Sequence, residues 1–104
     1  MNFWVNDRVL ANWTQDEFWY PATITEVEGE RFYVEFDDGD KEWITSDRLM
    51  SINIEVGARV YAKWQAGEEY YPGKITEKNG EDIYVVYDDG DEEWTTISFV
   101  RVTL

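Results

Sequence analysis

Short alternating segments dominate the hydrophobic pattern of this chain, and no segment keeps a 3.6-residue period over ten or more residues. Residues 59–64 alternate between apolar and polar side chains and are rich in strand-forming residues. Further short runs with strand-forming residues follow at 71–76, 83–87, 92–95 and 98–102. The pattern therefore predicts short β-strands in this half of the chain, and the other half shows the same arrangement.

Glycines mark the turns between these strands. Asn79-Gly80 is a strong hairpin signal, and we expect a type I′ turn there, which needs positive φ at both central residues. Asp89-Gly90 marks a second tight turn, and the first half has Glu28-Gly29 and Asp38-Gly39 instead. Five short strands in about fifty residues favour a small, strongly bent antiparallel barrel of SH3-like shape.

The chain contains an internal repeat, in which the second half has the same sequence pattern as the first. When residues 3–53 are aligned with residues 54–104, at a shift of 51 residues, 22 of the 51 paired positions are identical. We therefore predict an all-β fold of two five-stranded barrels in tandem, with domains at 1–53 and 54–104. Because barrels of this size have modest cores, we expect the two to pack together or share strands.

The composition excludes several kinds of site. The chain has 9 Lys+Arg, 23 Asp+Glu and no His or Cys, so its formal net charge is −14. Disulfides, thiolate metal sites, cysteine nucleophiles and histidine bases are therefore absent. Nucleic acid phosphates require a basic surface, which this charge argues against. We expect a folded protein that is not an enzyme and that needs no cofactor or metal.

No apolar stretch approaches the roughly 20 residues of a membrane-spanning helix. Met1 is not followed by a basic and then apolar signal segment. We therefore expect no membrane association and an intracellular location, nuclear in a eukaryote and cytoplasmic in a bacterium or phage. The oligomeric state is left open.

Three segments of the second half carry a family resemblance. Residues 56–64, 70–75 and 86–91 closely resemble a Tudor domain, and with the duplication the whole chain resembles a tandem Tudor module, Agenet-like and of the Royal superfamily. The resemblance implies a barrel that binds methylated lysine or arginine, as in histone tails, within an aromatic cage.

The resemblance also implies which residues form the cage. In the second repeat, which matches the family pattern more cleanly, they are Trp64, Tyr71, Tyr87 and Asp89; in the first repeat they are Trp13, Tyr20, Phe36 and Asp38. Some family members have a further aromatic residue where this chain has an acid. The auxiliary candidates are therefore Asp40 and Asp91 at that position, and Trp43 and Trp94 as possible replacements for the missing ring.

Other interpretations of these residues stay open. Aromatic side chains fill small cores efficiently, and we favour a structural role for Trp43, Trp94, Tyr33 and Tyr84. Asp-Gly also suits a tight hairpin, in which case the neighbouring acids are merely solvated. The acidic turns do not follow the ligand spacing of an EF-hand calcium loop.

The sequence thus predicts a non-enzymatic reader that binds a basic peptide or protein through a methylated lysine or arginine. Aromatic faces match a methylammonium group, which keeps its charge and gains apolar surface. One alternative is an acidic decoy or inhibitor whose negative surface occupies a basic partner. Another is an adaptor that uses a barrel face without a methyl-specific cage.

Overall fold

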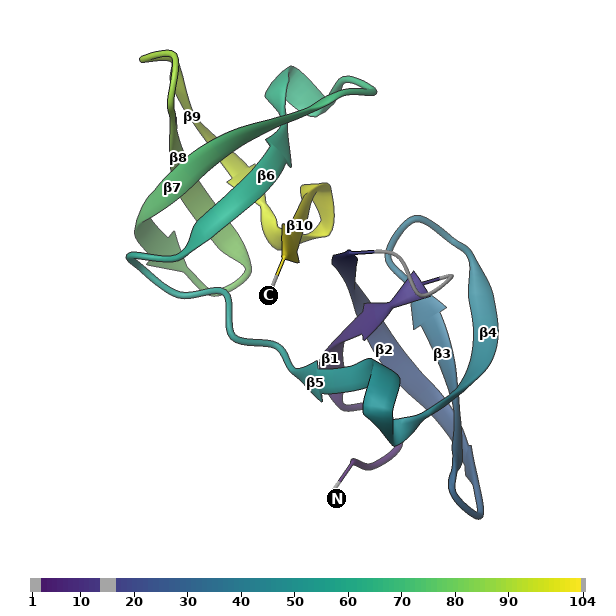
Figure 1. Ribbon diagram of the computed structural model, residues 1–104. Coiled ribbons are helices and arrows are strands. Elements are labelled where there is room, and N and C mark those ends of the chain that lie inside the picture. The colour runs from purple at the N-terminus through teal and green to yellow at the C-terminus, as the bar shows by residue number, and fades with distance from the viewer. Residues whose placement is uncertain (1–2, 14–16, 104) are drawn as a thin grey trace. The chain divides into compact units, whose positions relative to one another are not determined.

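A computed structural model describes residues 3–13 and 17–103 of the chain (Figure 1). It forms two compact units, one ending at Asn53 and the other spanning Ile54–Thr103. We call them unit 1 and unit 2 and describe each by itself. The described residues form β-strands and three-residue 3₁₀ turns, without an α-helix, so the all-β prediction is confirmed. None of the helical turns in these residues is long or apolar enough to cross a membrane.

Unit 1 is a five-stranded antiparallel sheet whose strand order is β5-β1-β2-β3-β4. A short 3₁₀ turn precedes the last strand and carries the chain to the far side of β1. The strands are β1 (Arg8–Asn12), β2 (Phe18–Glu28), β3 (Arg31–Phe36), β4 (Lys41–Thr45) and β5 (Leu49–Ser51).

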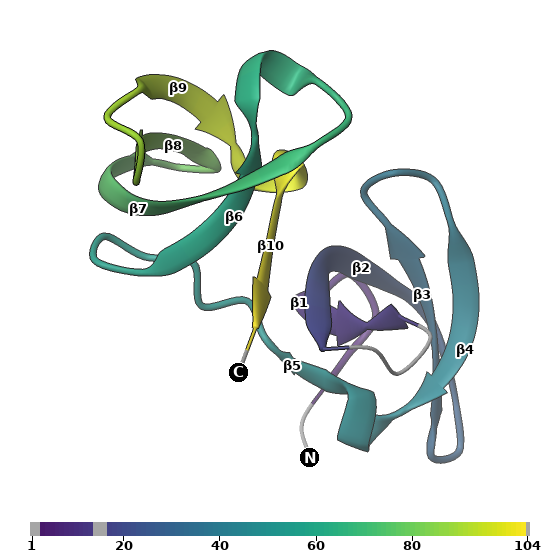
Figure 2. The same cartoon turned by 45° about the horizontal axis from the view of Figure 1, so that its top comes forward.

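Unit 2 repeats this arrangement with the strand order β10-β6-β7-β8-β9. Figure 2 shows the strong bend of β7 within this sheet. Among the described residues, β9 pairs with β8 alone and is therefore an edge strand. The strands are β6 (Arg59–Lys63), β7 (Tyr70–Asn79), β8 (Asp82–Tyr87), β9 (Glu92–Thr96) and β10 (Val100–Thr103).

The second strand of each unit contains a β-bulge. The register shifts between Ile24 and Glu26 in β2 and between Ile75 and Glu77 in β7. An extra residue on one strand bends it and increases its twist. This explains why β7 extends beyond the predicted range 71–76: a bent strand can continue along two neighbours and curl the sheet around its core.

The hairpin between β7 and β8 differs from the predicted turn. Asn79 is the last residue of β7 and pairs with Asp82, so the two central residues are Gly80 and Glu81. Gly80 has φ +64°, whereas neither Asn79 nor Glu81 has positive φ. Glycine at the first central position is the pattern of a type II′ turn, so the type I′ prediction is wrong.

Each unit has its own core of side chains on the inner face of its sheet. In unit 1 the core side chains include the alternating residues of β3, namely Phe32, Val34 and Phe36. Alternation places every second residue of a strand on the same face. The corresponding buried residues of β8 in unit 2 are Ile83, Val85 and Tyr87.

Candidate functional site

A cavity of about 180 Å³ in unit 2 contains all four residues that the resemblance implies for that repeat. Trp64 enters it from the 3₁₀ turn after β6, and Tyr71 from the start of β7. Tyr87 enters from the end of β8, and Asp89 and Asp91 come from the turn that follows. Three strand ends therefore bring three aromatic rings and two carboxylates to one point. We call this group of five residues the unit 2 cage.

The rings of the unit 2 cage differ in exposure. The Trp64 and Tyr87 rings are perpendicular, with their centroids 5.5 Å apart. Tyr87 is only 3% exposed and belongs to the core, whereas Tyr71 is 42% exposed. Tyr87 therefore closes the inner end of the cavity, and Tyr71 forms a wall that solvent reaches.

Glu93 supports the cage from β9, and sequence analysis missed it. One of its carboxylate oxygens accepts a hydrogen bond from the Tyr87 hydroxyl (2.7 Å) and another from the backbone N–H of Gln65 (3.1 Å). Burial, together with this hydrogen bond, raises the pKa of Tyr87 far above its ordinary value, so the phenol stays neutral. The only signal for this role is that Glu42 and Glu93 recur at the same place in the two repeats.

The turn that presents Trp64 has an unusual backbone. Gln65 and Ala66 have φ of +51° and +56°, in the left-handed region that side chains other than glycine rarely adopt. Such conformations are stable only where neighbouring groups hold them in place. The hydrogen bond from Gln65 to Glu93 is one such contact. Glu93 therefore links the floor of the cage to the turn carrying its tryptophan wall.

The acidic turn gives different roles to its aspartates. Asp88 binds Arg59 through two hydrogen bonds of 2.7 and 2.6 Å, and this contact lowers the pKa of the Asp88 carboxyl group. Asp89 accepts the backbone N–H of Asp91 (3.0 Å), which fixes the direction of its carboxylate at the rim of the cage. Within the described part of the chain, no group of three acidic side chains is placed to hold a metal ion.

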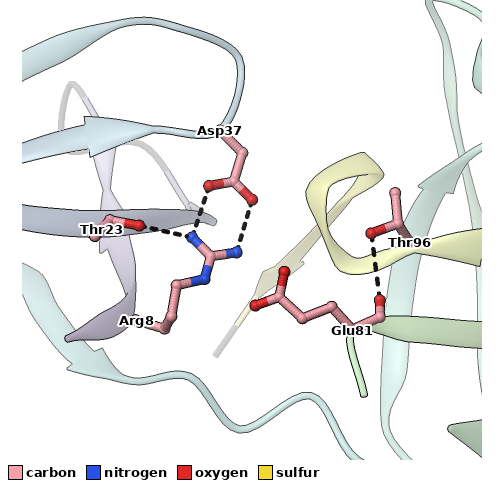
Figure 3. Close-up of polar contacts among 5 residues, drawn as sticks. All are labelled: Arg8, Thr23, Asp37, Glu81 and Thr96. Carbon is pink, nitrogen blue, oxygen red and sulfur yellow. Dashed lines mark hydrogen bonds and ion pairs between the residues drawn. The ribbon is translucent and has the colours of Figure 1, made fainter. Parts of the chain in front are cut away.

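The corresponding turn of unit 1 shows the same two roles for its aspartates. Figure 3 shows Arg8 donating to both oxygens of Asp37 (2.7 and 2.8 Å) and to the Thr23 hydroxyl (3.1 Å). Asp38 accepts the backbone N–H of Asp40 (3.1 Å). The first aspartate of each turn therefore pairs with an arginine, and the second accepts a backbone N–H within the turn.

The three predicted rings of unit 1 are also brought together. Trp13 contacts Tyr20 and Phe36, with centroid distances of 6.4 and 6.2 Å. Trp13 is 36% exposed, whereas Phe36 is buried in the core and has no hydroxyl group. Glu42, the counterpart of Glu93, binds Arg48 (2.6 Å) rather than the ring cluster.

The two tryptophans predicted as auxiliary cage residues lie elsewhere. Trp43 contacts Tyr33 (5.1 Å) and Trp94 contacts Tyr84 (5.3 Å), on the face of β3 and β8 opposite to the core residues. Neither therefore completes a cage. The prediction that Trp94 fills the core is wrong, because its side chain is 52% exposed.

The structure is similar to solved structures of paired small β-domains. The "Crb2 tandem tudor domains" align with a TM-score of 0.66 and 19% identity, covering 99% of this chain and 82% of that chain. "Arabidopsis thaliana AGDP1 AGD34" gives 0.47 and 16%, covering 96% and 82%. "ADCP1 tandem Agenet domain 3-4" gives 0.44 and 16%, covering 96% and 79%. The first comparison confirms the predicted tandem Tudor fold.

Comparison of the sequence with known proteins identifies a family for this chain. No curated protein matches the chain. One family model, described as a domain of unknown function, DUF4537, matches residues 6–101. Because the match covers nearly the whole sequence, the chain belongs to the DUF4537 family.

Proposed function

We propose that the chain is a non-enzymatic binding module for a basic peptide, and that the unit 2 cage holds a methylated lysine or arginine of that peptide. The observation that carries the proposal is the cavity lined by Trp64, Tyr71, Tyr87, Asp89 and Asp91. A lysine-rich, histone-tail-like segment has the chemistry of such a ligand.

The lining of the cavity suits a methylated cation. Methylation keeps the charge of an ammonium group, removes hydrogen-bond donors and adds apolar surface. A ring face attracts such a cation by roughly 0.5–1 kcal/mol when exposed and about 2 kcal/mol or more when water is excluded. The carboxylate of Asp89 adds Coulomb attraction at the rim and accepts a hydrogen bond from any N–H that remains.

The charge of the whole chain supports the choice of a basic ligand. A net charge of −14 attracts lysine- and arginine-rich segments and repels acidic ones. This attraction acts at a distance and is screened by salt, whereas contacts inside the cage are less affected by it. Salt therefore separates steering toward the surface from recognition in the cage.

The test is a calorimetric titration with peptides of one basic sequence in which a single lysine is unmodified or mono-, di- or trimethylated, or is replaced by dimethylarginine. We expect at least one methylated form to bind about tenfold or more tightly than the unmodified peptide, because several ring contacts act together. Trp64→Ala should remove this preference.

Trp13→Ala is the matched control, since it removes the equivalent ring from unit 1. It should preserve most of the preference for the methylated peptide. Equal affinity for methylated and unmodified peptides would contradict the proposal. In that case, binding that disappears with salt and survives Trp64→Ala indicates an acidic decoy, and binding that resists both indicates an adaptor.

A further inference from the structure

The outer face of each unit carries the same pair of aromatic side chains. In unit 1, Tyr33 lies directly opposite Trp43 in the pairing of β3 with β4. In unit 2, Tyr84 lies opposite Trp94 in the pairing of β8 with β9. The ring centroids are 5.1 and 5.3 Å apart. The duplication has therefore preserved a tryptophan platform that the cage does not use.

Unit 1 covers its platform with its own arginine. The Cζ atom of Arg31 lies over the Trp43 ring, 5.1 Å from the ring centroid. Arg31 pairs with Thr45, two residues beyond Trp43 on the same face of β4, so the guanidinium reaches the ring diagonally across the strands. This contact shows that the platform accepts a guanidinium group.

Unit 2 has an acid where unit 1 has this arginine. Asp82 is the counterpart of Arg31 at the shift of 51 residues, and it pairs with Thr96 in the same register. Trp94 is 52% exposed. It lines a groove of about 600 Å³ together with Asp82 and Glu93. Unit 2 thus has a carboxylate, Asp82, at the position of the arginine that covers the platform of unit 1, and its tryptophan ring is accessible.

We propose that this groove binds an arginine side chain of a partner peptide, whose guanidinium lies over Trp94 as that of Arg31 lies over Trp43. The Asp82 carboxylate then accepts its N–H groups. Arginine suits the site better than lysine, because a planar guanidinium can stack on a ring and donate two parallel hydrogen bonds to a carboxylate.

The groove lies next to the proposed cage, but the proposed arginine site does not require the cage to bind a ligand. Glu93 lines the groove and also accepts the hydroxyl hydrogen of Tyr87, the inner wall of the cage. The arginine site itself requires no methyl group.

The test is an NMR titration of the ¹⁵N-labelled full chain with N-acetyl-arginine amide, following the indole N–H signal of Trp94 assigned through Trp94→Phe. We expect a saturable shift of this signal. N-acetyl-lysine amide should bind about two- to fivefold more weakly, because it lacks planar stacking and the paired donors. The neutral analogue N-acetyl-citrulline amide should produce no saturable shift. Equal shifts from arginine and citrulline would overturn the proposal.

Two reciprocal substitutions use the internal repeat as a control. In Asp82→Arg, the new arginine should cover the Trp94 ring as Arg31 covers Trp43. Binding of the added arginine should weaken about tenfold or more, because the site acquires its own cation and loses its carboxylate. Arg31→Asp should open the unit 1 platform, so that the Trp43 indole signal also responds to arginine. Both positions are exposed, so folding should tolerate either change.

Undiminished arginine binding by Asp82→Arg, or no response of Trp43 in Arg31→Asp, would contradict the proposal. The probe carries no methyl group, and the signal comes from Trp94 rather than Trp64. A negative result here therefore leaves the methyl-peptide test intact, and a failed methyl-peptide test leaves this one intact.

Discussion

Units 1 and 2 share a fold and place three aromatic rings at equivalent strand ends, but they use one equivalent carboxylate differently. In unit 1, Glu42 binds Arg48, whose Nε also donates to the backbone oxygen of Asn12 (2.9 Å). In unit 2, Glu93 instead binds the Tyr87 hydroxyl and the Gln65 backbone. The same acid holds strand segments together in one unit and supports the ring cluster in the other.

Two substitutions between the repeats account for this difference. Phe36 becomes Tyr87, which supplies a hydroxyl for the carboxylate to accept, and Arg48 becomes Phe99, which removes the competing cation. A ring cluster therefore becomes a supported cavity without any change in strand order. The comparison shows that the two sites differ in the hydrogen-bond partners of Glu42 and Glu93, and not only in their aromatic rings.

The largest effect on stability is expected from Gly73→Ala in unit 2. A Cβ atom at Gly73 would lie 2.8 Å from Val85 Cγ1 and 2.9 Å from the Val86 backbone oxygen. Unit 1 has the buried Ala22 at this position, so its strands leave room for that methyl group. We expect Gly73→Ala to lower the free energy of unfolding by about 1–3 kcal/mol, as measured by urea denaturation.

Ala22→Gly is the matched control in unit 1. It creates no clash and should lower the free energy of unfolding by about 1–1.5 kcal/mol, through chain entropy and the lost burial of one methyl group. If Gly73→Ala proved as mild as this control, the close approach of β7 to β8 would not distinguish the two units.

An intermediate effect is expected from Tyr87→Phe, which gives unit 2 the side chain of unit 1. The change removes the hydrogen bond to Glu93 and should lower the free energy of unfolding by about 1 kcal/mol at neutral pH. The variant should also bind the methylated peptide more weakly, because the ring at the inner end of the cage is no longer held by Glu93. Urea denaturation and peptide titration of the same variant measure both effects.

Alkaline pH sharpens this prediction. The pKa of Tyr87 is raised in the folded protein above its ordinary value of about 10. The folded state therefore keeps a proton that the unfolded state releases, and the contribution of Tyr87 is complete below pH 10 and is lost as pH rises through the folded pKa. Tyr87→Phe should lose less stability than the wild type between neutral pH and pH 11. Parallel pH profiles would contradict this.

The smallest effect is expected at the paired arginines. The side chains of Arg8 and Asp37 are 25% and 14% exposed, whereas those of Arg59 and Asp88 are 60% and 48% exposed and are therefore more strongly screened by water. Asp37→Asn should therefore destabilise unit 1 by under about 1 kcal/mol, and Asp88→Asn should have a smaller effect in unit 2. Thermal unfolding of the two variants provides the comparison, and the reverse order would show that solvent exposure does not decide the strength of these pairs.

Acid titration provides an independent check of the unit 2 pair. Arg59 lowers the pKa of the Asp88 carboxyl group, so the contribution of this pair is present above about pH 4 and is lost as pH falls through the lower folded value. Asp88→Asn should remove this part of the acid sensitivity. Its control is the wild type in high salt, which screens the same exposed pair.

Much of the fold could be predicted because it depends on local chemistry. Alternation gave the strands, and Gly39, Gly80 and Gly90 marked turns where the backbone does adopt positive φ. The type of the β7–β8 turn and the length of β7 could not be predicted in this way. Both depend on which residues pair across the hairpin, and the bulge between Ile75 and Glu77 shifts that register.

For the candidate site, the repeat and the family resemblance identified ring and acid positions that the structure brings together in one cavity. The sequence could not identify the partner of Glu93, because Glu42 holds the same place in the repeat, directly before a tryptophan, and has a different partner. Nor could it distinguish the exposed Trp94 from the half-buried Trp43, because both follow a glutamate at the same place in the repeat.

The sequence by itself therefore determined the duplication, the all-β class, the turn positions and the acidic charge, because each depends on residue type and spacing along the chain. Only the tertiary structure decided that Glu93 supports the cage and that Asp82 replaces the arginine that covers the equivalent platform. Those roles depend on which side chains meet across strands. Contacts between residues far apart in the sequence are fixed by register and packing.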